Sequence, residues 1–291
     1  MASFVLVHGG GHGGWCYAKV KRLLERERHE VFAPSLTGLA ERSASLTPAV
    51  DLDFHIAAVV RLLYYWDLRD VILVGHSYGG MVVTGVADRA ADRVGKLVYL
   101  DAANPKHGQS LVDIAGPVIE VTRPMGDVVD GVELVLLPAE GAAAFYGVDD
   151  PQDRAWTDAR LTGHPWKCFE QKLRLKNERA LSAIPQFHIV CESTIATRDR
   201  EMIENARSEG RLWQIDTGHD LMLTEPQFVS DSLCEIAARW SVGEPAVETL
   251  AAAARVEPTA RRPHPGAPGE QPLCRQRRLP VAEQPFLTSG R

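Results

Sequence analysis

The sequence predicts an α/β fold in which a mostly parallel, doubly wound sheet carries an inserted helical cap. Short apolar runs alternate with helical patterns over the first 100 residues, the alternation stops at about residues 105–184, and it then resumes as far as Trp240. Strands that alternate with helices favour right-handed crossovers, which produce a parallel sheet covered on both faces. The chain has 291 residues and is 45% apolar, which is enough to bury a large core without disulfides or metal ions.

Four strands and three helices are expected in the first 100 residues. The strands are short apolar runs followed by turn-forming residues, at 4–7, 30–34, 71–74 and 96–100. The helices are amphipathic stretches at 18–28, 51–66 and 81–88. In the second of these, Ile56, Val59, Val60 and Leu63 recur at helical spacing, which places them on one face.

The stretch 105–184 is too long for a plain loop, so it should have structure of its own. Its aromatic side chains either line a pocket or form the core of the inserted cap: Phe145, Tyr146, Trp156 and Trp166. After this stretch, strands at 186–190 and 212–215 and helices at 198–208 and 226–240 complete the fold.

The composition excludes several classes of protein. The net charge of −6 comes without the basic patch that nucleic-acid binding needs. The five cysteines lack metal-like spacing, so we expect free, buried thiols. The start of the chain has no signal-peptide pattern, and no apolar run is long enough to span a membrane. We therefore expect a cytoplasmic protein that uses neither metal nor cofactor and binds a small molecule; its oligomeric state is not indicated.

Residues 243–291 differ in composition from the rest of the chain. They hold eight of the 18 prolines and an arginine-rich tract, without a sustained apolar period. Such a segment cannot bury enough apolar surface to offset the entropy lost on ordering it. The sequence therefore predicts a folded domain at residues 1–242 and a disordered Pro/Arg-rich tail at 243–291.

A serine flanked by glycines follows the third predicted strand. Gly75-x-Ser77-x-Gly79 stands directly after an apolar run and directly before a helical pattern. Glycine on both sides allows a tight, strained turn that lifts the serine hydroxyl above the sheet edge at a helix N-terminus. This context indicates that Ser77 is a nucleophile.

His219 is the candidate base. A hydroxyl is a poor nucleophile until a base accepts its proton, and His219 follows the last predicted strand, late in the domain. The other histidines lie in the first loop, in the serine turn or inside a strand: His8, His12, His76 and His188. The order of serine before histidine is the one expected for this architecture.

The glycines after the first strand indicate an oxyanion hole. His8-Gly-Gly-Gly11 follows that strand, where serine hydrolases of this architecture place one donor; the residue after the nucleophile supplies the other. We therefore expect the backbone N–H groups of Gly10 and Tyr78 to stabilise the negative charge of the transition state. Such donors are worth about 3–4 kcal/mol each.

These motifs make the chain resemble a known family. The stretches VLVHGGGHGGWCY (5–17), DVILVGHSYGGMV (70–82), KLVYLDAANP (96–105) and DTGHDLMLTEP (216–226) are similar to those of small α/β-hydrolases related to plant methyl-salicylate esterases and hydroxynitrile lyases. Within that branch the chain looks closest to small bacterial esterases that hydrolyse methyl carbamates such as carbendazim. The resemblance covers about residues 3–240 and implies an α/β-hydrolase fold with a cap over the active site, corresponding to residues 105–184.

The chain departs from the family pattern in two places. Hydroxynitrile lyases of this branch carry threonine after the first-loop histidine and lysine after the catalytic histidine, where this chain has Gly9 and Asp220. Lyase chemistry is therefore not expected. The family's usual acid lies just beyond the strand that ends here at Cys191, but residues 192–194 read EST and no aspartate occurs before Asp199.

Three carboxylates are candidates to orient His219 and to stabilise its cation. Asp101 ends the strand that should lie next to the serine strand if the sheet is wound as in the family. Glu192 is nearest to the usual position of the acid. Asp199 begins a predicted helix and should face solvent. We take Asp101 as the candidate, and Glu192, Asp199 or the absence of any acid stay open as alternatives.

The function that these residues predict is that of a serine hydrolase, specifically a carboxylic-ester hydrolase. The resemblance implies a small, largely apolar ester or carbamate as substrate, cleaved through an acyl-enzyme on Ser77. Two alternatives stay open: a carbon–carbon lyase on the same fold, and a non-catalytic ligand-binding protein that keeps the serine and the histidine.

Overall fold

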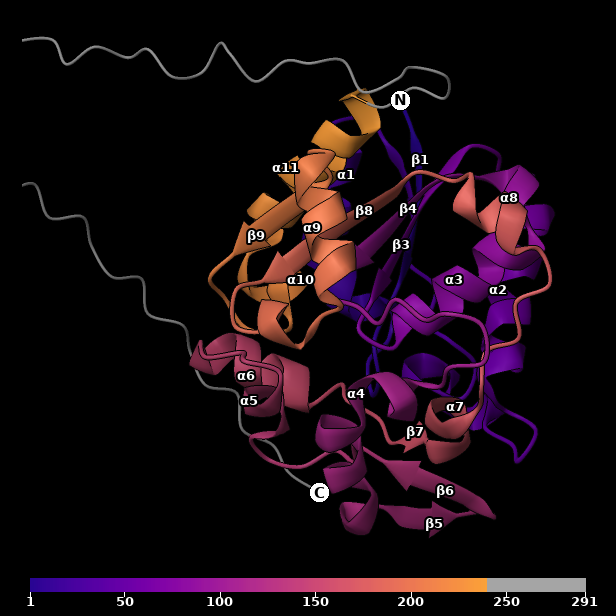
Figure 1. Ribbon diagram of the computed structural model, residues 1–291. Helices are drawn as coiled ribbons and strands as arrows, with labels where there is room; N and C mark the ends of the chain where they lie inside the picture. Colours follow the sequence, from indigo (N-terminus) through magenta and orange to yellow (C-terminus); the bar gives the residue numbers. More distant parts are fainter. Residues whose placement is uncertain (240–291) are drawn as a thin grey trace, which may run out of the picture. The chain divides into compact units, whose positions relative to one another are not determined.

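A six-stranded parallel sheet forms the centre of the computed structural model, which describes residues 1–239 (Figure 1). The strand order is β2-β1-β3-β4-β8-β9. The bounds of these strands are Ser3–Val7 (β1), Glu30–Phe32 (β2), Val71–His76 (β3), Val94–Leu100 (β4), Gln186–Cys191 (β8) and Leu212–Ile215 (β9). The tail predicted at residues 243–291, and the domain boundary at residue 242, lie outside the described residues.

Helices cover both faces of the sheet, as predicted. In Figure 1, α1 and α11 lie on one side of the sheet, and α2, α3 and α8 lie on the other. Their bounds are Ala18–Arg26 (α1), Leu52–Tyr65 (α2), Gly79–Arg89 (α3), Glu178–Ser182 (α8) and Pro226–Arg239 (α11). Two further helices, Arg200–Ser208 (α9) and Leu221–Thr224 (α10), flank β9 in the sequence. Short 3-10 helices occur at Gly14–Tyr17, Ala40–Ser45, Ala91–Arg93, Glu120–Met125 and Ile195–Thr197.

The inner strands β1, β3, β4 and β8 read as nearly continuous apolar runs because both faces of the sheet are buried there. Successive side chains of a strand point to opposite faces, and β3 divides its residues accordingly. Val71 and Leu73 belong to the core packed under α2 and α3. Ile72 and Val74 belong to the core packed under α1 and α11. This double burial is the reason that the apolar runs were sufficient to predict the strands.

The parallel register brings several loops to the carboxyl edge of the sheet. His76 of β3 pairs with Leu100 of β4, so Ser77 and Asp101 each follow a paired residue. On the other side of β3, Val7 of β1 pairs with Gly75, which places the glycine loop after β1 beside the serine turn. Ligands of open α/β sheets bind at this edge.

The segment between β4 and β8 covers this edge and forms the inserted cap. Its elements are α4 (Leu111–Ile119), β5 (Asp127–Val129), β6 (Val132–Val135), α5 (Ala142–Phe145), α6 (Pro151–Asp158), β7 (His164–Pro165) and α7 (Trp166–Glu170). The helices were expected. The three-stranded antiparallel sheet β5-β6-β7 is an addition to the predicted helical cap. Its hairpin turns at Asp130 and Gly131, with φ of 51° and 77°, the positive pair that a two-residue hairpin turn requires.

No helix among residues 1–239 is long and apolar enough to cross a membrane. Four free cysteines occur in the described chain, of which Cys16, Cys168 and Cys191 are buried and Cys234 is half-buried. The prediction of free thiols is confirmed for these four positions, and Cys274 lies outside the described residues.

Candidate active site

Ser77 lies in the turn between β3 and α3, in the left-handed region of the backbone with φ of 53°. A non-glycine residue adopts this conformation only when its surroundings impose it. The backbone packs closely around both flanking glycines. A Cβ added to Gly75 would lie 2.6 Å from the carbonyl oxygen of Gly79, and a Cβ added to Gly79 would lie 2.5 Å from the carbonyl oxygen of Val7. Both glycines are therefore required, and the half-buried Ser77 lies in the tight turn that was predicted.

His219 lies in the loop after β9 and contacts Asp101. Its Nδ1 is 2.5 Å from Oδ2 of Asp101, and the carboxylate is fully buried while the imidazole is 26% exposed. An ionised carboxylate only accepts hydrogen bonds, so Nδ1 carries the proton and the neutral ring has an unprotonated Nε2. This is the tautomer that a general base needs.

Three further donors converge on Asp101. Its Oδ1 accepts hydrogen bonds from Thr194 Oγ1 at 2.5 Å, Arg198 Nη2 at 2.8 Å and the Cys191 backbone N–H at 3.3 Å. Burial raises the pKa of Asp101, but the hydrogen bond and charge of His219 and the charge of Arg198 outweigh it, and the pKa lies well below its ordinary value. Asp101 is therefore ionised across the neutral range.

The family usually places its catalytic acid in the loop after β8. In this chain that loop instead supplies hydrogen-bond donors to Asp101. Arg198 and Thr194 both lie in it, and neither was identified from the sequence because its partner stands almost 100 positions earlier. Glu192 is exposed. Asp199 caps α9 by accepting a hydrogen bond from the Met202 N–H at 3.1 Å. Of the three candidate carboxylates, the structure brings Asp101 against His219.

The loops of Ser77 and His219 are joined through the residue before the serine. His76 donates a hydrogen bond from Nε2 to the carbonyl oxygen of His219 at 2.9 Å. No hydrogen bond joins Ser77 to His219 directly within residues 1–239. Such a bond is often long in an unliganded site and tightens when substrate binds.

The loops that carry the two predicted oxyanion donors adjoin the nucleophile. A Cβ added to Gly9 would lie 2.8 Å from Cβ of Ser77, so the glycine loop touches the serine turn. In the part of the chain that the structure describes, neither the Gly10 nor the Tyr78 backbone N–H donates a hydrogen bond to another protein group. Side chains of the cap pack closely against Gly10, since a Cβ added to Gly10 would lie 2.9 Å from both Leu136 Cδ1 and Phe169 Cζ.

The side chain of Tyr78 is anchored away from the nucleophile. Its hydroxyl lies 2.9 Å from Nδ1 of His55, and Nε2 of His55 lies 2.9 Å from the carbonyl oxygen of Thr37. Because that carbonyl only accepts, Nε2 carries the proton of His55, and Nδ1 accepts the hydrogen bond of Tyr78. The two bonds fix Tyr78 and with it the position of its backbone N–H.

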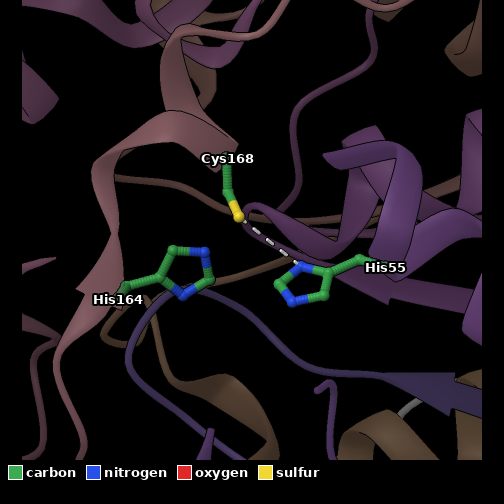
Figure 2. A group of neighbouring side chains, drawn as sticks. All are labelled: His55, His164 and Cys168. Atoms are coloured by element: carbon green, nitrogen blue, oxygen red, sulfur yellow. Dashed lines mark hydrogen bonds between the residues drawn. The ribbon is translucent and has the colours of Figure 1, made fainter. Parts of the chain in front are cut away.

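A potential metal-ligand set lies beside this anchor. Figure 2 shows His55 from α2, His164 from β7 and Cys168 from α7, with one ring nitrogen of His164 pointing toward the sulfur. The three are buried, and their possible ligand atoms lie within 4.8 Å of one another. Burial lowers the pKa of His55 to about 4 and raises the pKa of Cys168 to about 12. At neutral pH the group is thus a neutral imidazole beside a thiol.

The hydrogen bonds of His164 do not fit metal binding. A histidine that binds a metal through one nitrogen donates a hydrogen bond from the other. In His164, Nδ1 instead faces a donor, the backbone N–H of Gly11, at 3.3 Å. Neutral His164 therefore carries its proton on Nε2, the buried nitrogen that has no partner within residues 1–239. We assign the cluster to packing around Tyr78.

The aromatic side chains of the cap separate into different roles. Trp166 is 3% exposed and belongs to the core under α2 and α3, whereas Phe145 is 53% exposed. Trp156 packs edge-on against Trp15, with ring centroids 5.2 Å apart. Tyr146 reaches the site, because its hydroxyl donates to the Gly10 carbonyl oxygen at 3.3 Å.

Comparison with known proteins gives consistent matches. The sequence model of the alpha/beta hydrolase family matches residues 4–232. The chain is 52% identical over 249 residues to the carbendazim hydrolyzing esterase of Nocardioides sp. (strain SG-4G), a match that covers 81% of this chain and 100% of that protein. It is 29% identical over 252 residues to methylesterase 2 of Arabidopsis thaliana, covering 80% of this chain and 95% of that protein.

Solved structures show the same fold. An extracellular alpha/beta-hydrolase from a Paenibacillus species superposes with a TM-score of 0.68 at 23% identity, covering 81% of this chain and 98% of that one. A methylesterase from Arabidopsis superposes with a TM-score of 0.62 at 22% identity, covering 81% and 99%.

Proposed function

Because the chain belongs to the alpha/beta hydrolase family, as its motifs predicted, we propose that it hydrolyses esters through Ser77, His219 and Asp101. The relatives identified in the sequence comparison are esterases, and the chain is a carboxylic-ester hydrolase of this kind. The observation that supports the finer assignment is the hydrogen bond of 2.5 Å between His219 Nδ1 and the buried Asp101.

In the first half of the reaction, Ser77 Oγ attacks the carbonyl carbon of the substrate while His219 Nε2 accepts the hydroxyl proton. The backbone N–H groups of Gly10 and Tyr78 stabilise the oxyanion of the tetrahedral intermediate. When that intermediate collapses, the bond to the leaving alkoxide breaks. His219 then gives its proton to the departing oxygen, which leaves an acyl group on Ser77.

In the second half, His219 accepts a proton from water, and the resulting hydroxide attacks the acyl carbon. Collapse of this second intermediate breaks the bond to Ser77 Oγ, which takes the proton back from His219. The carboxylic acid, or the carbamic acid in the case of a carbamate, is released. Asp101 keeps its negative charge throughout and stabilises the imidazolium that forms in each half.

We propose a small, largely apolar ester or methyl carbamate as substrate. Two observations support this class. One relative is an esterase that hydrolyses carbendazim, a methyl carbamate. In this chain, Leu136 and Phe169 of the cap approach the oxyanion loop at Gly10, and apolar walls with few polar anchors are typical of small-molecule sites.

The test is turnover of a fluorogenic short-chain ester and of an aryl methyl carbamate, with and without a serine-reactive organophosphate. We expect hydrolysis that the reagent abolishes, and loss of several powers of ten in the Ser77→Ala variant. Activity of Ser77→Ala within about tenfold of the parent would refute the nucleophile. Tight retention of the ester without turnover would support a binding protein instead.

A further inference from the structure

A second histidine and a second aspartate form a buried pair behind the catalytic base. Nε2 of His12 lies 2.8 Å from Oδ2 of Asp220, and both side chains are fully buried. Nδ1 of His12 lies 2.8 Å from the carbonyl oxygen of Gly10. The pair therefore joins the residue that directly follows His219 to the loop of the oxyanion hole.

The hydrogen bonds define the protons of this pair. The Gly10 carbonyl only accepts, so Nδ1 of His12 is protonated, and a further proton must lie between Nε2 and the carboxylate. Burial lowers the pKa of His12, but the charge of Asp220 and the hydrogen bonds outweigh it and leave the pKa raised. Burial raises the pKa of Asp220, and His12 reverses this so that the pKa is lowered. Both directions favour an imidazolium paired with a carboxylate.

Aromatic rings enclose the imidazolium. Trp15 stacks on His12 with ring centroids 5.3 Å apart and an interplanar angle of 26°. Tyr146 meets the same ring edge-on at 4.7 Å. Aromatic faces stabilise a buried cation, so these contacts agree with the charged form.

The pair also engages the cap and the serine turn. The Asp220 N–H donates to the Tyr146 carbonyl oxygen at 3.0 Å, and the Tyr146 hydroxyl donates to the same Gly10 carbonyl as His12. On the other side, Nε2 of His76 is 3.8 Å from Asp220 Oδ1. Three loops of the active site thus meet at one ion pair.

Stability alone is a weak reason to bury such a pair. Two buried charges lose so much hydration that replacing them with apolar residues is often neutral or stabilising. The chain has a buried aspartate elsewhere, Asp88, which accepts hydrogen bonds from the backbone N–H groups of Lys176 and Asn177, and within residues 1–239 its hydrogen bonds reach no residue proposed for the active site. Asp88 therefore provides a comparison for a purely structural carboxylate.

We propose that His12 and Asp220 are positioning residues that hold the oxyanion donor of Gly10 in register with the base His219. The proposal rests on the function proposed above for Ser77 and His219. Breaking the pair should displace Gly10 relative to His219, and misplacement of catalytic groups by about 1 Å costs about 100-fold in rate. Substrate affinity should change little, because neither side chain is exposed to bind it.

The first experiment compares Asp220→Ala with Asp220→Asn. We expect kcat of Asp220→Ala to fall about 100-fold, with KM within about threefold of the parent. Asn has the same shape and can donate from its amide to Nε2 of a neutral His12, so Asp220→Asn should regain kcat to within about tenfold of the parent. If the carboxylate of Asp220 were purely structural, kcat would not differ in this way between the two variants. The control variant, Asp88→Ala, should lose stability while its kcat is retained.

A double-mutant cycle completes the test. His12→Ala and Asp220→Ala break the same connection, so the double variant should lose no more kcat than either single variant. The proposal is overturned if the two losses multiply, if Asp220→Ala turns over like the parent, or if Asp220→Asn is as slow as Asp220→Ala. Ser77→Ala measured alongside separates the two claims: its inactivity supports the nucleophile whatever Asp220 does.

Discussion

Asp101 leaves its strand in the left-handed region with φ of 42°, as Ser77 does with φ of 53° at the end of the neighbouring strand. Two adjacent strands therefore end in strained residues that present the candidate nucleophile and the candidate acid at one edge of the sheet. Strain of this kind costs about 1–3 kcal/mol per residue and persists where the surroundings impose it. At Asp101 the four donors to its carboxylate supply that constraint.

The role of Asp101 can be tested by two amide substitutions. Asp101→Asn keeps the side-chain shape but favours the wrong imidazole tautomer, so kcat should fall about 10⁴-fold. Glu192→Gln is the matched control, since its exposed side chain should change kcat only a few-fold. Both are measured by turnover of one ester. A severe loss in Glu192→Gln with a mild loss in Asp101→Asn would reverse the assignment, and mild losses in both would leave His219 without a catalytic carboxylate.

The hydroxyl group of Tyr78 is a second group to test. Tyr78→Phe removes the hydroxyl donor to His55 Nδ1 and leaves this buried acceptor with only the weak thiol donor of Cys168 at 3.9 Å, which should cost about 1–3 kcal/mol of unfolding free energy. Urea unfolding measures this loss. Because the backbone N–H stays, the oxyanion donor persists, and kcat should fall far less than in Asp101→Asn. A loss of kcat as large as that of Asp101→Asn would show that the hydroxyl takes part in the reaction.

A local pattern in the sequence predicts a turn of the backbone, whereas a contact between distant positions depends on how the elements are arranged. The turn at Ser77 was predictable because glycines stand two positions before and two positions after it. The contact between His219 and Asp101 spans 118 positions, and it became a prediction only through the order of the strands. The contact between His12 and Asp220 spans 208 positions and crosses from the first loop to the last, so no local pattern could reveal it.

At the scale of elements, the centre of the sheet was predictable because its inner strands β1, β3, β4 and β8 are buried on both faces. The strand β5 shows the opposite case, since all three of its residues are exposed and no apolar run marks it. The dipeptide Asp130-Gly131 was the available signal, because this pair favours a two-residue hairpin turn. The prediction of a helical cap did not use this signal.

Two glycines of the cap should respond differently to substitution by alanine. Gly131 has φ of 77° with open space around it, so Gly131→Ala should destabilise by about 1–2 kcal/mol through backbone strain alone. Gly116 lies in α4, where an added Cβ would meet only Glu120 at 3.9 Å. Gly116→Ala should therefore be neutral or stabilise by up to about 1 kcal/mol. Urea unfolding of both variants measures these changes in unfolding free energy. Equal changes in the two variants would contradict the hairpin turn.

At the scale of the whole molecule, the buried histidines connect the fold to pH. Burial lowers the pKa of His8 and His76 to about 3 and that of His55 and His188 to about 4, and it lowers the pKa of His164 well below its ordinary value. These imidazoles are neutral in the folded protein, whereas the unfolded chain protonates them below about pH 6.5. His12 is the exception, because its pKa is raised.

The sign of the pH dependence follows from these shifts. Between about pH 6.5 and 4 the unfolded state binds more protons than the folded state at each lowered histidine, so the unfolding free energy decreases as the pH falls. Each such histidine contributes up to about 1.4 kcal/mol per pH unit. His12 acts in the opposite direction: its contribution is complete below about pH 6.5 and is lost as the pH rises through its raised pKa. The lowered carboxylates, Asp101 and Asp220, lose their contribution only below about pH 3.9.

We therefore expect the unfolding free energy to fall steeply from pH 6.5 to pH 4, measured by urea unfolding at intervals of half a pH unit. His188→Phe isolates one histidine away from the active site. His188 is 4% exposed and stacks on Tyr99 at 5.1 Å with an interplanar angle of 9°, and phenylalanine can keep that stacking while it cannot bind a proton. The slope of His188→Phe should be smaller than that of the parent by up to about 1.4 kcal/mol per pH unit, with little change at pH 8. Equal slopes would mean that His188 is protonated alike in both states, and a parent whose stability is flat over this range would contradict the assignment of neutral buried histidines as a group.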